Sequence, residues 1–126
     1  MSEYCVVFCT VPSADAAEAV ARGLLEERLA ACVGVLPSVR SFYMWKGELC
    51  RDDEVLLVIK TTRAAYPALE RSIRSRHPYE VPEIVRLPID AGWPPYLDWI
   101  RDSVSPEGAG GGSGSTAPSL PPTAES

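Results

Sequence analysis

The sequence has few of the side chains and motifs on which catalytic sites are usually built. Its 126 residues include a single histidine. No segment matches the serine-hydrolase elbow, the phosphate loop, the dinucleotide fingerprint or the zinc-protease helix. Two acidic runs, Glu26–Glu27 and Asp52–Glu54, are interpreted as solvated faces because neighbouring surface carboxylates usually are. These absences favour a binding protein over an enzyme.

The sequence also lacks a basic excess and a long hydrophobic run. Twelve Lys and Arg residues are scattered among 17 Asp and Glu, which gives a net charge of -5. Such a surface does not favour nucleic acid or anionic membranes as partners. No apolar run approaches the roughly 20 residues of a membrane span, and Met1-Ser2-Glu3 does not resemble a secretory signal. We therefore expect a cytoplasmic protein.

The four cysteines do not form a recognisable framework. Cys5, Cys9, Cys32 and Cys50 are irregularly spaced and include no CxxC pair, so we expect reduced thiols that are mostly buried. Cys5 and Cys9 share a strand face but lie about 13 Å apart along it, too far to chelate one ion. Each is a buried apolar residue or one ligand of a site completed by other segments. Cys9 is the better candidate ligand, since it precedes a helix whose dipole favours a thiolate.

The composition divides the chain into two parts. Hydrophobic residues make up 46% and charged residues 23%, as in ordinary globular proteins. After Ser103 the sequence becomes rich in Gly, Ser and Pro and offers little to bury. We expect a domain over residues 1–102 and a flexible tail over residues 103–126.

Hydrophobic periodicity predicts an α+β domain. The expected elements are a strand in 3–12, a helix in 13–29, strands in 31–45 and 54–60, a helix in 64–76, a strand in 81–89 and a helix from residue 94. The strands of 31–45 and 54–60 form a long β-hairpin around a turn at residues 46–48, and Pro37 marks an edge or a bend. The order βαββαβ plus a terminal helix predicts a ferredoxin-like split βαβ fold.

Five aromatic residues are many for a domain of this size. They are Tyr43, Trp45, Trp93, Tyr96 and Trp99. Either they all fill the core of one subunit, or some are exposed on the hairpin and its surroundings. Exposed aromatics beside unpaired strand edges favour association with further copies of the chain.

A metal site is the most specific chemistry that the residues allow. His77 begins a rigid connection, His77-Pro78-Tyr79-Glu80-Val81-Pro82-Glu83, that ends in a carboxylate. Thiolate, imidazole and carboxylate together suit copper or zinc. The alternative is that His77 and Glu83 serve turns and surface pairs, and spacing alone does not decide between the two.

Several sequence blocks carry a family resemblance. They are Phe8-Cys9-Thr10-Val11-Pro12, residues 29–33 (LAACV), residues 41–48 (SFYMWKGE), residues 54–61 (EVLLVIKT), residues 77–84 (HPYEVPEI) and residues 96–100 (YLDWI). In this order and spacing, over residues 4–102, the chain resembles the divalent-cation tolerance proteins of the CutA type. The resemblance implies a ferredoxin-like subunit in a homotrimer, with the hairpins of neighbours joined into continuous sheets. It further implies copper or another divalent cation bound by Cys9, His77 and Glu83.

Three hypotheses follow from the sequence. In the first, the protein is a cytoplasmic homotrimer that binds copper or another divalent cation through Cys9, His77 and Glu83. In the second, it is a regulatory module that senses a small molecule or a protein, similar to the trimeric PII proteins, with Lys60, Arg63 or Arg86 as charges for an anion. In the third, it is an assembly scaffold whose partners use the trimer or the tail.

Overall fold

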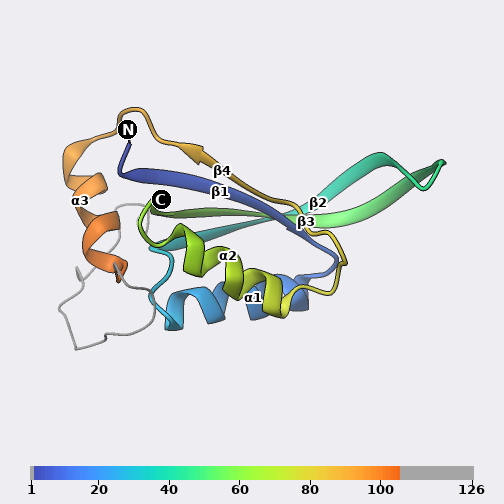
Figure 1. Cartoon of the computed structure of the whole chain (residues 1–126), viewed down its shortest axis with the longest axis horizontal. Coiled ribbons are helices and arrows are strands. Elements are labelled where there is room, and N and C mark those ends of the chain that lie inside the picture. The colour runs from blue at the N-terminus through green and yellow to red at the C-terminus, as the bar shows by residue number, and fades with distance from the viewer. Residues whose placement is uncertain (1, 106–126) are drawn as a thin grey trace.

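A computed structural model of the chain describes residues 2–105 (Figure 1). The elements in chain order are β1 (Tyr4–Val11), α1 (Ala14–Glu26), β2 (Cys32–Trp45), β3 (Glu48–Thr62), α2 (Tyr66–Arg76), β4 (Ile84–Pro88) and α3 (Pro94–Ser103). The strands form one sheet in the order β2-β3-β1-β4, and every neighbouring pair is antiparallel. The predicted α+β architecture and its βαββαβ order are therefore confirmed. Within residues 2–105, no helix is both long and apolar enough to cross a membrane.

The core lies between one face of the sheet and helices α1 and α2, which run side by side beneath it in Figure 1. Alternate residues of β1 point to this face, so Val7, Cys9 and Val11 are fully buried. Leu57 and Ile59 of β3 join them there. Ser13 caps α1 by accepting a hydrogen bond from the backbone N–H of Ala16. Helix α3 packs at the end of the sheet farther from the hairpin tip (Figure 1).

The hairpin of β2 and β3 is longer than predicted because β3 begins at Glu48 instead of Glu54. The turn is reduced to Lys46 and Gly47, both at positive φ, which is the conformation of a two-residue hairpin turn. The early part of β3 was not predicted because it contains the charged segment Arg51-Asp52-Asp53. This part pairs with β2 outside the core and therefore shows no apolar pattern. Figure 1 shows this part of the hairpin extending well beyond the helices.

The interruption predicted at Pro37 is confirmed. β2 is an edge strand, and its pairing with β3 shifts register between Leu36 and Val39. Ser38 has a φ of 69°, so the chain is irregular at Pro37 and Ser38. Proline is tolerated there because the missing backbone N–H is not needed for pairing with β3. The hairpin is thereby divided into a base within the sheet and an arm of residues 39–53, which we call the hairpin arm.

Three other boundaries differ from the predictions. Helix α1 ends at Glu26 instead of near residue 29, because the chain turns at Arg28 with a φ of 59°. β4 covers only Ile84–Pro88, so residues 77–83 form a longer connection than expected. The domain continues past residue 102, since Ser103 is helical and the backbone N–H of Ser105 donates to the carbonyl of Arg28. The rest of the predicted tail lies outside the described residues.

The second face of the sheet is apolar but has no helix over most of its width. Val6 and Phe8 of β1 point to this face, and β4 places Leu87 and Val85 directly beside them. On the other side, Leu56 and Val58 of β3 stand opposite Leu36 and Gly34 of β2. Val85, Leu87 and Leu36 are each more than 40% exposed. We call this surface the open sheet face.

Aromatic residues are also exposed on the hairpin arm and before α3. Trp45 is 44% exposed and Trp93 68% exposed, so the five aromatic residues do not all fill the core of one subunit. Tyr96 and Trp99 of α3 stack on each other, and the ammonium of Lys60 lies over the Tyr96 ring.

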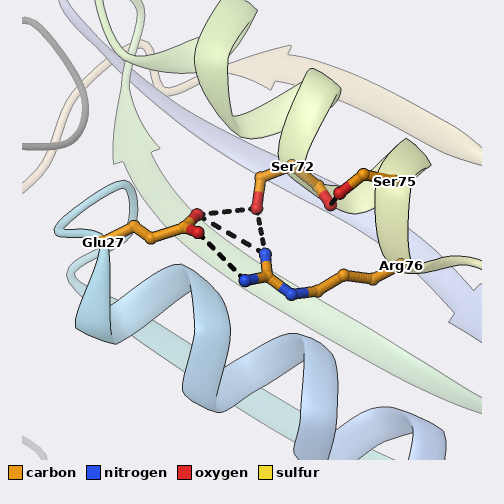
Figure 2. Close-up of polar contacts among 4 residues, drawn as sticks. All are labelled: Glu27, Ser72, Ser75 and Arg76. Atoms are coloured by element: carbon orange, nitrogen blue, oxygen red, sulfur yellow. Dashed lines mark hydrogen bonds and ion pairs between the residues drawn. The ribbon is translucent and has the colours of Figure 1, made fainter.

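A polar network joins the ends of α1 and α2 (Figure 2). Arg76 forms an ion pair with Glu27 at 2.9 Å, and Ser72 donates to the same carboxylate while it accepts from Arg76. The hydrogen bonds from Arg76 and Ser72 lower the pKa of Glu27. Arg76 lies against Gly23, where a Cβ atom would meet its guanidinium. The network holds the last turn of α2, directly before His77, against α1.

We predict that Glu27→Gln lowers the free energy of unfolding by about 0.5–1 kcal/mol at neutral pH, since the pair is partly solvent-exposed. Because folding lowers the pKa of Glu27, its contribution is complete above the unfolded-state value near 4.3 and is lost as pH falls through the folded-state pKa. Urea unfolding of both proteins at pH 7, 5 and 3.5 measures this. The neighbouring Glu26→Gln is the control, and an equal loss for both variants at pH 7 would contradict the prediction.

Candidate functional site

A cavity of about 740 Å³ lies where the hairpin arm meets the connection of residues 77–83. The arm supplies Ser41, Phe42, Tyr43 and Trp45, and the connection supplies Pro78, Tyr79, Glu80, Val81 and Glu83. Thr10, at the end of β1, and Glu54 of β3 complete the lining. The cavity therefore combines aromatic walls with three carboxylates. We call it the arm cavity.

His77 is placed by the proline that follows it. A residue before proline is excluded from the helical region, so α2 ends at Arg76 and His77 is extended, with φ -89° and ψ 136°. Its Nε2 lies 2.7 Å from the carbonyl oxygen of Thr10, and its Nδ1 accepts from the backbone N–H of Tyr79 at 3.1 Å. An accepting Nδ1 assigns the proton to Nε2, which then donates to Thr10. Both ring nitrogens are therefore engaged in hydrogen bonds.

Cys9 is fully buried beneath the same carbonyl. Its Sγ lies 3.8 Å from the oxygen of Thr10, so Cys9 and His77 approach one backbone atom. Burial raises the pKa of the Cys9 thiol to about 12, and the charges of Glu83 and Glu54 contribute to the increase. The thiolate expected at Cys9 is not favoured, because desolvation and two carboxylates raise the pKa of the thiol. At neutral pH the group is a thiol.

The carboxylates around Cys9 differ in exposure. Glu83 is exposed at the end of the connection, whereas Glu54 is only 7% exposed and accepts a hydrogen bond from the hydroxyl of Tyr79 at 2.9 Å. Burial and this bond raise the pKa of Tyr79. Tyr43, on the arm, donates likewise to Asp52, which raises the pKa of Tyr43 to about 12. Two tyrosine–carboxylate pairs thus line the region.

The structure places two of the three predicted ligands at one backbone oxygen. His77 and Cys9 meet at the Thr10 carbonyl, and Glu83 is close enough for its charge to act on the Cys9 thiol. Nevertheless, within residues 2–105 no three side chains of His, Cys, Asp and Glu are grouped tightly enough to hold a metal ion. The assignment of Cys9, His77 and Glu83 as ligands stays a prediction.

Sequence reasoning missed Glu54 and Tyr79. The run Asp52–Glu54 was expected to be a solvated face, which is wrong for Glu54 because the Tyr79 hydroxyl and the neighbouring connection cover it. A signal was present in the sequence. Glu54 is the first residue of the apolar run 54–60 and shares a strand face with Leu56 and Val58.

Comparison with known proteins gives one consistent result. Residues 5–103 match the family described as CutA1 divalent ion tolerance protein. The chain is 51% identical over 98 residues to the divalent-cation tolerance protein CutA of Thermus thermophilus, with 78% of this chain and 95% of the relative covered. It is 52% identical over 97 residues to the Protein CutA homolog of Xenopus laevis, where 77% of this chain but only 64% of the longer relative is covered.

Solved structures share the fold. The divalent cation tolerance protein of Thermus thermophilus superposes with a TM-score of 0.80 at 49% identity, covering 81% of this chain and 99% of that one. CutA1 from Oryza sativa gives a TM-score of 0.80 at 38% identity, covering 82% of this chain and 95% of that one. CutA1 of Shewanella sp. SIB1 gives the same TM-score at 43% identity, covering 82% of this chain and 96% of that one. The similarity therefore covers the sheet, the helices and the hairpin together.

We predict that Tyr79→Phe lowers the free energy of unfolding by about 1–3 kcal/mol, because a buried Glu54 carboxylate loses its hydroxyl donor. The matched control is Tyr43→Phe, which removes a similar bond to Asp52 on the exposed arm and should have little effect. Urea unfolding at pH 7 measures both variants. Equal stabilities for Tyr79→Phe and the unmodified protein would show that Glu54 does not depend on Tyr79.

Proposed function

The chain belongs to the CutA1 divalent ion tolerance family, and we propose that it serves this tolerance by binding copper or another divalent cation as its cargo. One observation carries the proposal. The imidazole of His77 and the thiol of Cys9 approach the same Thr10 carbonyl, and Glu83 acts electrostatically on that thiol. A soft and a borderline donor thus lie beside one backbone oxygen of Thr10, which lines the arm cavity, and the carboxylate of Glu83 lines the same cavity.

Binding requires local exchange of protons and hydrogen bonds. The Cys9 thiol must lose its proton, which its raised pKa opposes. A ring nitrogen of His77 must also give up its bond to Thr10 or Tyr79. A cation supplies the positive charge that stabilises the thiolate beside Glu83 and Glu54, so the carboxylates that raise the thiol pKa then favour the bound ion.

Copper is the ion that this donor set favours among the common divalent metals. For a given site of nitrogen, oxygen and sulfur ligands, affinity rises along the first-row series to Cu²⁺ and falls again at Zn²⁺. Thiolate and imidazole both suit copper. We propose copper as the preferred cargo and Zn²⁺ as a weaker one.

We predict that affinity for Zn²⁺ and Cu²⁺ rises with pH between 6 and 8, because the ion displaces the Cys9 proton. Cys9→Ser and Glu83→Gln should each lower affinity by roughly tenfold or more, as even a supporting group of a metal site contributes about 10–100-fold. Anaerobic isothermal titration calorimetry in two buffers of different ionisation enthalpy reports both the affinity and the proton release. Zn²⁺ provides a probe that cannot oxidise the thiol.

The matched controls are Glu80→Gln, which removes another carboxylate of the arm cavity, and Cys50→Ser, which removes a thiol of the arm. Both should keep the affinity of the unmodified protein. Uptake that falls equally in Glu80→Gln and Glu83→Gln would point to diffuse electrostatic attraction and contradict a site at Cys9, His77 and Glu83.

We further propose that the protein works as a homotrimer in the cytoplasm, without catalysis. The open sheet face and the aromatic hairpin arm are large apolar surfaces that one subunit leaves in water, and β2 and β4 each have an unpaired edge. Copies of the chain would cover both surfaces at once, with the arm of one subunit beside the sheet of the next. Four free cysteines suit a reducing compartment.

We predict that Leu87→Lys dissociates the trimer. Leu87 is 41% exposed on the open sheet face of a single subunit, so the lysine is tolerated there but would be buried unpaired between subunits. Leu25→Lys is the matched control, since Leu25 is 43% exposed on α1. Native mass spectrometry and sedimentation velocity measure the mass. A trimer that survives Leu87→Lys would refute assembly through this face.

A second candidate function is a sensing module that binds a small molecule. Its support is the arm cavity, whose volume of about 740 Å³ and mixture of aromatic and acidic side chains are typical of small-molecule sites. The metal titrations separate the two functions. A sensing module would retain its small molecule in Cys9→Ser, whereas a cation carrier would lose its ion.

A further inference from the structure

A second cavity, of about 370 Å³, lies at the other end of β1 from the arm cavity. It is lined by the beginning of β1, the segment before α2 and the end of β4. Arg63, Arg86 and Asp90 are its charged residues, and Tyr4, Cys5 and Pro88 form much of its apolar wall. Two cations thus face one carboxylate, in a chain whose net charge is -5.

Arg86 is oriented before any ligand arrives. It stands opposite Val7 in the register of β4 with β1, and its guanidinium carbon lies 5.3 Å from the centre of the Tyr66 ring at the start of α2. A cation–π contact at this distance restrains the side chain of Arg86. In the part of the chain that the structure describes, Arg86 takes part in none of the ion pairs. Its N–H groups are therefore not neutralised by a carboxylate.

The charge of Arg86 also acts inside the cavity. Burial raises the pKa of the Cys5 thiol, and Arg86 opposes this increase. The guanidinium thus influences a wall atom that is itself nearly inaccessible to water.

Arg63 is the second cation among the lining residues. Its backbone N–H donates to the carbonyl of Glu3 at 2.8 Å, which ties the segment before α2 to the beginning of β1. Ser2 fixes the opposite side, since its hydroxyl donates to the carbonyl of Ile89 at 2.6 Å. The walls that carry Arg63 and Arg86 are therefore connected by backbone contacts and do not depend on a ligand for their shape.

We propose that this cavity binds the oxyanion group of a small molecule, a phosphate or a carboxylate, at the guanidinium of Arg86, with Arg63 as a second positive charge in the lining. Guanidinium groups recognise both oxyanions through paired N–H···O bonds. The volume lies at the lower end of ligand sites and accommodates a small metabolite whose body rests on Tyr4 and Pro88. The proposal does not depend on the metal site, because the two cavities share no lining residue.

The test is a titration of the full chain with inorganic phosphate and, separately, with succinate, at constant ionic strength in sodium chloride. The readout is the Nε–H cross-peak of Arg86 in two-dimensional NMR, together with the backbone cross-peaks of Tyr4 and Cys5. We expect saturable shifts of all three. Arg86→Gln should weaken binding by roughly tenfold or more, because it removes a charge-assisted hydrogen-bond donor.

The matched control is Arg74→Gln, which removes an exposed arginine of α2 that does not line the cavity. The affinity of this variant should stay within about twofold of the affinity of the unmodified protein. Since about 1.4 kcal/mol corresponds to tenfold, the difference is only a few tenths of a kcal/mol. Arg86→Lys keeps the charge but not the planar fork, so it should bind more weakly than the unmodified protein and more tightly than Arg86→Gln.

Three outcomes would overturn the proposal. The first is shifts that increase linearly with anion concentration, and the second is an equal loss of binding in Arg86→Gln and Arg74→Gln. The third is unchanged affinity in an Arg86→Gln protein that retains the circular dichroism spectrum of the unmodified chain. Saturation by phosphate alone would assign the site to phosphorylated compounds, and saturation by succinate alone would assign it to carboxylates.

Discussion

The candidate site depends on one hydrogen bond, between the imidazole of His77 and the carbonyl of Thr10. This bond joins the segment after α2 to the end of the central strand β1. Pro78 makes it possible by forcing His77 out of the helix, and the N–H of Tyr79 holds the ring from its other side. Tyr79 then reaches Glu54 on β3. Three segments, the connection of residues 77–83, β1 and β3, are thus joined by these bonds, and all three line the arm cavity.

The part of the fold that follows from local patterns could be predicted from the sequence. Val7, Leu57 and their neighbours form unmistakable strands because their apolar side chains fill the core. The arm could not be delimited in this way, since residues 39–53 pair with each other without packing on the core. The irregularity at Pro37 could be predicted because proline lacks the backbone N–H that strand pairing requires, whatever residues surround it.

The assignment of Cys9, His77 and Glu83 as ligands stays a prediction, and the structure shows only that Cys9 and His77 approach one backbone oxygen. The protonation state of Cys9 was not predictable, because it depends on burial in the core between the sheet and helices α1 and α2 and on carboxylates more than 40 residues away in sequence. Glu54 was missed for a related reason, since its cover comes from Tyr79, which a strand pattern does not reveal.

The hairpin arm carries charges among its exposed aromatic residues. Arg40 faces Asp53 across the strands at 3.6 Å, and Lys46 lies over the Trp45 ring at the tip. An exposed edge with only apolar side chains would template pairing with almost any extended chain. Charged side chains at fixed positions disfavour wrong pairing. A strand that pairs with the arm in the wrong register either meets like charges or buries an unpaired charge. The charges of the arm thus disfavour pairing of its exposed edge with an unrelated strand.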